Sequence, residues 1–142
     1  MKNVKYLIAF IGIISIFIFG CTKVNEEQFI KVQKRIGVEY NYEDFKEITE
    51  SEQVQKVKDI IKDINWRNAQ VDMVRPADYR FVFQFKNPDI DAKAVTYELW
   101  ISPNKDKVEL VKDTEGKYTQ LDTDKSAELF EILTGEKLSD LK

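Results

Sequence analysis

Few side chains in this 142-residue sequence are of the types that enzymes use as nucleophiles or bases. There is one cysteine, Cys21, and no histidine, against 25 acidic and 22 basic residues. The lack of histidine excludes Ser–His–Asp and Cys–His nucleophile pairs, ordinary zinc sites and the most usual base near neutral pH. Carboxylates remain, and in pairs they can hydrolyse glycosidic bonds or bind cations.

Two acidic pairs have a spacing that could suggest calcium: Asp89 with Asp91, and Asp122 with Asp124. Neither pair extends into a loop with the glycine and the distal glutamate that a calcium-binding loop requires. Asp124 also lies where the positive end of a helix favours a carboxylate. The sequence therefore predicts no metal site and no cofactor.

A further group of candidate residues follows from the alternation in two expected strands, residues 79–86 and 94–101. The side chains that point away from the apolar face include Arg80, Val82, Gln84, Glu98 and Trp100. Because an aromatic and an aliphatic residue on a polar sheet face can anchor a ligand or a partner, we predict this face as the binding surface. Two alternatives stay open: a loop or the N-terminal strand covers Trp100, and Glu98 with Arg80 forms an ordinary cross-strand ion pair.

The head of the chain has the layout of a secretory signal. Lys2 and Lys5 precede an apolar run, residues 6–19, that is broken only by Gly12 and Ser15. A positive segment, an apolar segment and then a small residue is the order of a cleaved signal peptide. The run is shorter than the roughly 20 apolar residues that span a bilayer. We therefore expect cleavage after residue 20, with an uncleaved signal anchor as the alternative.

The run ends in Ile18-Phe19-Gly20-Cys21, which resembles the bacterial lipobox. The resemblance implies that the Cys21 thiol gains a diacylglyceryl group and that Cys21 becomes the first residue of the mature chain. Two acyl chains hold a protein durably on a membrane. We expect residues 1–20 to be a lipoprotein signal peptide, 21–28 a lipidated tether and 29–142 a single domain on the outer face of the cell membrane.

Charge limits the partners of this domain. Residues 1–20 hold two of the 22 basic residues and no acidic one, so the rest of the chain carries a net side-chain charge of −5. Nucleic acid rewards basic patches, so it is not an expected partner. Anionic headgroups repel an acidic domain, so the acylated Cys21 is expected to make the contact with the bilayer. Another exported protein is a candidate second partner.

Hydrophobic periodicity predicts seven strands and two helices. Alternating residues predict strands at 29–38, 45–48, 66–74, 79–86, 94–101, 107–112 and 117–121. Helical spacing of apolar residues predicts one helix that Ser51 or Thr49 caps and that stops near Asn65-Trp66. It predicts a second helix over residues 124–134, capped by Asp122 or Thr123. Gly135 suits the position just after the second helix, and residues 136–142 are expected to be a tail.

These elements predict an α+β fold. One face of the sheet is expected to carry Tyr79, Phe81, Phe83, Phe85, Val95, Tyr97, Leu99 and Ile101. Both helices have an apolar stripe to bury, and the simplest arrangement packs both against that face. We therefore expect two layers, with an antiparallel meander of about five to seven strands and both helices on one side. A cleaved signal helix precedes this domain.

A set of residues in the C-terminal half carries a family resemblance: Pro76, Asp78, Tyr79, Leu99, Trp100, Ile101, 108–111, Tyr118, Leu121, Ser126, Ala127, Leu129, Ile132 and Leu133. With these residues, the stretch 75–133 and, more loosely, the helix over residues 54–64 resemble the YhfM-like lipoproteins of Bacillus-type bacteria. Most of them are core or turn positions, so the resemblance supports the fold more than a site. It implies a Gram-positive cell-surface setting, and it lends no catalytic residues.

The sequence favours a membrane-anchored extracytoplasmic lipoprotein whose domain is a small non-enzymatic binding or accessory module. One alternative is a hydrolase of the cell wall or of peptides that uses only carboxylates, which needs two acids facing each other across a cleft. The other is an inhibitor of another exported protein.

Overall fold

The computed structural model describes residues 27–68, 71–90 and 94–142. The strands are β1 (Gln28–Arg35), β2 (Tyr42–Ile48), β3 (Arg67–Asn68), β4 (Tyr79–Phe85), β5 (Thr96–Ile101), β6 (Val108–Lys112) and β7 (Lys117–Gln120). The helices are α2 (Ser51–Lys62), α3 (Thr123–Thr134) and the short 3-10 helix η2 (Leu138–Asp140). The expected signal peptide (residues 1–20), Cys21 and most of the expected tether (residues 21–28) lie outside the described residues.

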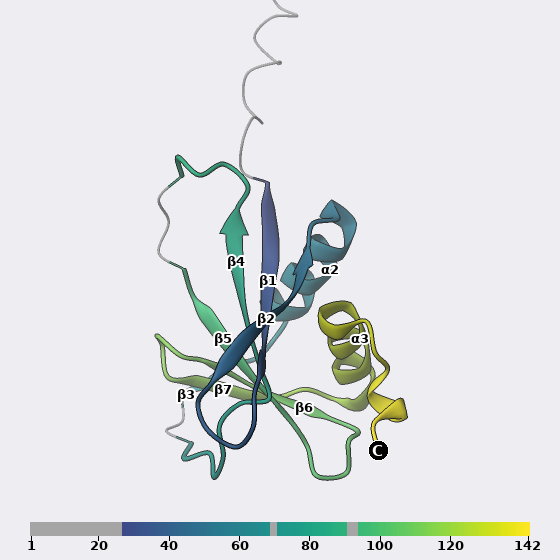
Figure 1. Ribbon diagram of the computed structural model, residues 1–142. Helices are drawn as coiled ribbons and strands as arrows, with labels where there is room; N and C mark the ends of the chain where they lie inside the picture. Colours follow the sequence, from purple (N-terminus) through teal and green to yellow (C-terminus); the bar gives the residue numbers. More distant parts are fainter. Residues whose placement is uncertain (1–26, 69–70, 91–93) are drawn as a thin grey trace, which may run out of the picture.

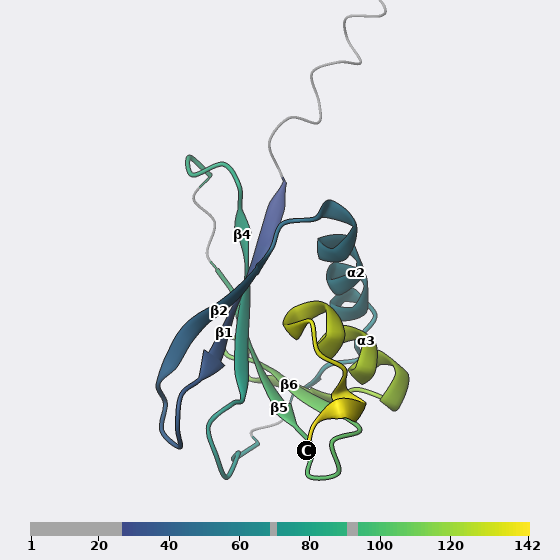
Figure 2. The same ribbon diagram turned by 45° about the vertical axis from the view of Figure 1, so that its right-hand side comes forward.

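The strands form one seven-stranded antiparallel sheet in the order β2-β1-β4-β5-β6-β7-β3. Both α-helices lie on the same side of this sheet, and none of the described residues forms a helix on the other side (Figures 1 and 2). The sheet twists strongly, so that β6 and β7 run across the direction of β1 and β4 (Figure 1). The predicted two-layer α+β fold is confirmed.

The predicted meander is correct only for β4 to β7. β1 lies between β2 and β4, and α2 carries the chain from the β2 edge of the sheet to β3 at the opposite edge. Of the strand expected over residues 66–74, the structure describes Arg67–Asn68 as β3, paired with Tyr118 and Lys117. Residues 71–74 lie in no strand, and residues 69–70 are outside the described ranges.

The core lies between the helices and the sheet face predicted to be apolar. Phe81 and Leu99 are almost fully buried there, and Val57 of α2 and Phe130 of α3 cover them. The rings of Phe81 and Tyr97 stack with their centres 5.1 Å apart. Such pairs add roughly 0.5–1.5 kcal/mol to the burial of apolar area, so the aromatic row on β4 and β5 is a major part of the core.

Both ends of α3 agree with the sequence prediction, whereas the start of α2 differs from it. Asp122 caps α3, with its Oδ1 accepting from the Lys125 amide at 2.8 Å, and Gly135 has φ 77° at the other end. The residue before α2 is Glu50, whose side chain makes no cap hydrogen bond, so the predicted cap by Thr49 or Ser51 is wrong. The expected tail is also wrong, because Leu138 of η2 is 3% exposed and packs in the core.

Tyr79 gives the core a pH-dependent stability. Its ring lies edge-on to Phe45 and Phe130, and burial, followed by the charges of Glu136 and Asp78, raises the pKa of Tyr79 to about 12. The phenol of an unfolded chain titrates near pH 10, so stability from the protonated phenol is present below about pH 10 and is lost as the pH rises to about 12. The loss amounts to about 3 kcal/mol, since one pKa unit corresponds to about 1.4 kcal/mol.

We therefore expect Tyr79→Phe to lose less stability than the wild-type protein between about pH 9 and about pH 12. Urea unfolding across this range measures the effect, and Tyr40→Phe, at a tyrosine that is 71% exposed, is the matched control. Equal losses in the wild type and in Tyr79→Phe would contradict the prediction.

Candidate functional site

Arg80 and Glu98 lie opposite each other at the middle of the sheet face that has no helix. Arg80 of β4 is in register with Glu98 of β5, and its Nη2 is 3.2 Å from Glu98 Oε1. The guanidinium also lies over the ring of Tyr42, 3.9 Å from its centre. Burial raises the pKa of Glu98, and the charge of Arg80 opposes this effect. The two residues therefore form a cross-strand ion pair that is partly shielded from water.

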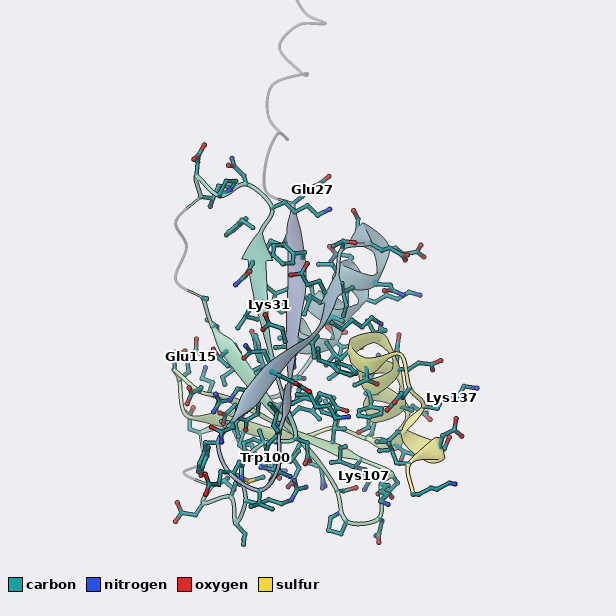
Figure 3. All side chains as sticks on the ribbon, in the orientation of Figure 1. Glu27, Lys31, Trp100, Lys107, Glu115 and Lys137 are labelled. Atoms are coloured by element: carbon teal, nitrogen blue, oxygen red, sulfur yellow. The ribbon has the colours of Figure 1, made fainter. Side chains whose placement is uncertain are left out.

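Trp100 is not available as a surface anchor. Its side chain is 5% exposed, and its indole N–H donates to the carbonyl oxygen of Arg75 at 2.8 Å. The loop between β3 and β4 thus covers Trp100, which was the first of the two alternatives. Figure 3 shows Trp100 near the end of the sheet away from Glu27. The prediction of an open aromatic anchor fails because periodicity identifies the face of a residue but not the loop that lies on it.

Asp78 holds this covering loop against the sheet. Its Oδ1 accepts from Arg35 at 3.3 Å and also from Arg75, and its Oδ2 accepts from the amide of Ile101 at 2.8 Å. We call these contacts the Asp78 clasp. The clasp joins β1, the loop and the end of β5. The side chain of Asp78 is only 17% exposed, so these contacts are partly shielded from water. From the sequence, Asp78 was simply a turn residue.

Val82 and Gln84, also predicted for the binding face, do not lie beside Trp100 under the loop. Val82 is half-buried in β4, between Lys31 of β1 and Thr96 of β5. Gln84 lies two residues further along β4 and lines a groove at the end of the molecule where β1 begins. The five residues predicted as one binding face therefore lie in four different surroundings.

That groove has a volume of about 770 Å³. It lies between α2 and the ends of β1, β4 and β5 and is mainly apolar. Its lining consists of Gln28, Phe29, Lys58, Ile61, Lys62, Phe83, Gln84, Phe85, Lys86, Asn87, Pro88, Ile90, Ala94, Val95 and Tyr97. The volume is within the range of about 300–1,000 Å³ that is typical of sites for small molecules. We call this hollow the apolar groove.

Among the described residues that line the apolar groove, the charged ones are three lysines: Lys58, Lys62 and Lys86. Lys58 Nζ lies 6.0 Å from the centre of the Phe83 ring. Lys86 Nζ is 3.3 Å from the carboxylate of Glu27 and 3.2 Å from the carbonyl oxygen of Thr49, so its charge is partly balanced. Apolar walls with cations at the rim suit a molecule with an apolar body and an anionic group.

The sequence analysis missed the apolar groove. Phe83 and Phe85 were assigned to the apolar face that the helices cover, and Lys58 and Lys62 were not singled out. The available signal was the row of aromatic residues continuing to Phe85, followed by Pro88 and Ile90, beyond the point where a helix covers the sheet. Which part of an apolar row remains uncovered depends on the angle at which the helices cross it.

A second, polar hollow of about 490 Å³ lies beside β7, and Asp63, Arg67, Asp122 and Lys125 are in its lining. It brings two carboxylates to one cavity, but Asp122 already serves as the cap of α3. Within residues 27–68, 71–90 and 94–142, no three acidic residues gather to hold a metal ion. Asp91 of the considered calcium pair lies outside these ranges. No helix in the same ranges is long and apolar enough to cross a membrane.

The fold and the groove define a small α+β domain with one twisted sheet and a hollow of ligand size at one end. The chain belongs to the YhfM family, since the family model described as YhfM protein matches residues 23–139. This confirms the predicted YhfM-like family, and the match also covers the strands before the helix at residues 54–64, which the predicted resemblance did not include. Comparison with curated proteins and with solved structures gives no match.

Proposed function

We propose that the protein is a lipoprotein anchored to the outer face of the cell membrane through Cys21, and that its domain acts by binding rather than by catalysis. The anchor is supported by the two lysines, the apolar run and the lipobox-like Ile18-Phe19-Gly20-Cys21. The observation that carries the binding role is the apolar groove with its cationic rim. Its ligand has an apolar body and an anionic group.

Two alternatives have less support. A carboxylate-dependent hydrolase needs two free acids across a cleft, and in the polar hollow Asp122 is engaged as a helix cap. An inhibitor of another exported protein would also act by binding, and measurements of protein–protein interaction would distinguish it. Neither alternative explains why apolar side chains and lysines share one groove.

The anchor is tested by Cys21→Ala in cells fed with labelled palmitate. We expect the wild-type protein to incorporate the label and to fractionate with membranes. Protease added to intact cells whose walls have been removed should digest it. Cys21→Ala should lose the label completely, because the thiol that forms the thioether is gone. Thr22→Ala, next to it, is the matched control and should keep the label.

Mass spectrometry of the mature protein gives the second measurement. We expect the first residue to be Cys21 with its acyl chains. An unacylated N-terminus, or a domain that external protease cannot reach, would contradict the proposed function.

A further inference from the structure

The apolar groove lies at the end of the domain that the anchor would bring to the membrane. Gln28 lines it, and the amide of Lys86 donates to the carbonyl oxygen of Glu27 at 2.8 Å. Glu27 marks this end of the molecule in Figure 3. Cys21 is six residues earlier, a stretch that reaches at most about 20 Å when fully extended. An acylated Cys21 would therefore hold the groove close to the lipid headgroups.

The charges of the groove differ in sign from those of the domain as a whole. The chain after residue 20 has a net charge of −5, yet Lys58 and Lys62 of α2 both line the groove. Lys86 is paired with Glu27, so Lys58 and Lys62 are the cations expected to meet an incoming anion. A negative membrane surface attracts lysines placed near it and repels the acidic remainder of the domain. This difference would orient the domain with the groove toward the bilayer.

The apolar lining fits the other part of a lipid. Phe85 and Ile90 are only partly buried by the protein, so they offer apolar surface at the mouth of the groove. An acyl chain placed against them would remove this surface from water, which is favourable by about 25 cal/mol per Å². A phosphate at the other end of the same molecule would meet the two lysines of α2.

We infer that the apolar groove takes an acyl chain of an anionic phospholipid from the membrane that holds the anchor, with Lys58 and Lys62 at its phosphate. This inference rests on the proposed function, because the anchor supplies the proximity. The domain then lies against the bilayer by its groove end and presents the opposite end, with the Asp78 clasp, away from it.

The test uses the mature acylated protein reconstituted into vesicles that contain phosphatidylglycerol with a photoreactive diazirine in one acyl chain. After illumination, we expect crosslinks to map to residues 58–62 and 83–90. Lys58→Gln combined with Lys62→Gln should reduce these crosslinks about tenfold, as expected for the loss of two lysines near an anionic surface. Lys107→Gln combined with Lys137→Gln removes the same charge elsewhere and should have no effect (Figure 3).

Vesicles of phosphatidylcholine with the same photoreactive chain provide the second comparison, and crosslinking there should also be about tenfold lower. Sedimentation with the vesicles reports the anchor separately. Protein that sediments but does not crosslink at the groove would overturn this inference and leave the anchor standing, as would equal crosslinking in both lipids or in the Lys58/Lys62 variant. Protein without acyl chains would overturn the proposed function itself.

Discussion

Replacing Trp100 with alanine should lower the free energy of unfolding by about 3–5 kcal/mol, as is typical when a large buried aromatic side chain is removed. Two losses add together. The indole is 5% exposed, so its removal leaves a cavity under the loop between β3 and β4. The carbonyl oxygen of Arg75 also loses the indole N–H that bonds to it at 2.8 Å. Urea unfolding followed by circular dichroism measures the change.

Trp100→Phe separates these two losses. It keeps most of the buried apolar area and removes the hydrogen bond, so we expect a smaller decrease, of about 1–2 kcal/mol. A binding residue would behave differently: Trp100→Ala would leave stability unchanged and reduce the affinity for a ligand. That outcome would restore the open sheet face as the candidate site and contradict the structural role of Trp100.

Asp78→Ala should lower the free energy of unfolding by about 3–4 kcal/mol. The reason is that three donors, on Arg35, Arg75 and the amide of Ile101, converge on the poorly exposed carboxylate of Asp78. Its loss leaves the amide of Ile101 and the guanidinium of Arg35, whose side chain is 18% exposed, without their acceptor. Removing one partner of a buried charged pair costs more than the pair contributes, because the remaining charge stays poorly hydrated.

Asp72→Ala is the matched control, because Asp72 is exposed in the same loop. It should change stability by less than about 0.5 kcal/mol. Since Arg75 contacts both Asp78 and Trp100, the double variant Asp78→Ala with Trp100→Ala should lose less than the sum of the single losses. Full additivity, or a loss from Asp78→Ala no larger than from Asp72→Ala, would show that the clasp does not hold the loop.

The sequence analysis succeeded where local pattern decides the structure. The alternation around Phe81 and Leu99 predicted β4 and β5 with the correct core face, because one face of each strand is apolar and the other is not. The spacing of Val54, Val57, Ile60 and Ile61 likewise predicted α2, and all four are buried.

The predictions failed where the structure depends on contacts between segments that are far apart in the sequence. β3 pairs with β7, and this pairing depends on a register between residues about 50 positions apart. The cover over Trp100 depends on the conformation of a loop fixed by Asp78. The apolar groove depends on where α2 lies across the sheet. Residue types along the chain carry little information on the pairing of β3, the loop over Trp100 or the position of α2.

The position of β1 has a mechanical consequence. This strand follows directly from the N-terminal segment, yet it is an inner strand, hydrogen-bonded to β2 along one side and to β4 along the other. Tension applied ahead of Gln28 would load both ladders at once, so β1 could not be unzipped bond by bond as an edge strand can. A force that acts on the domain while its N-terminal end is held would thus meet the most strongly braced strand of the sheet.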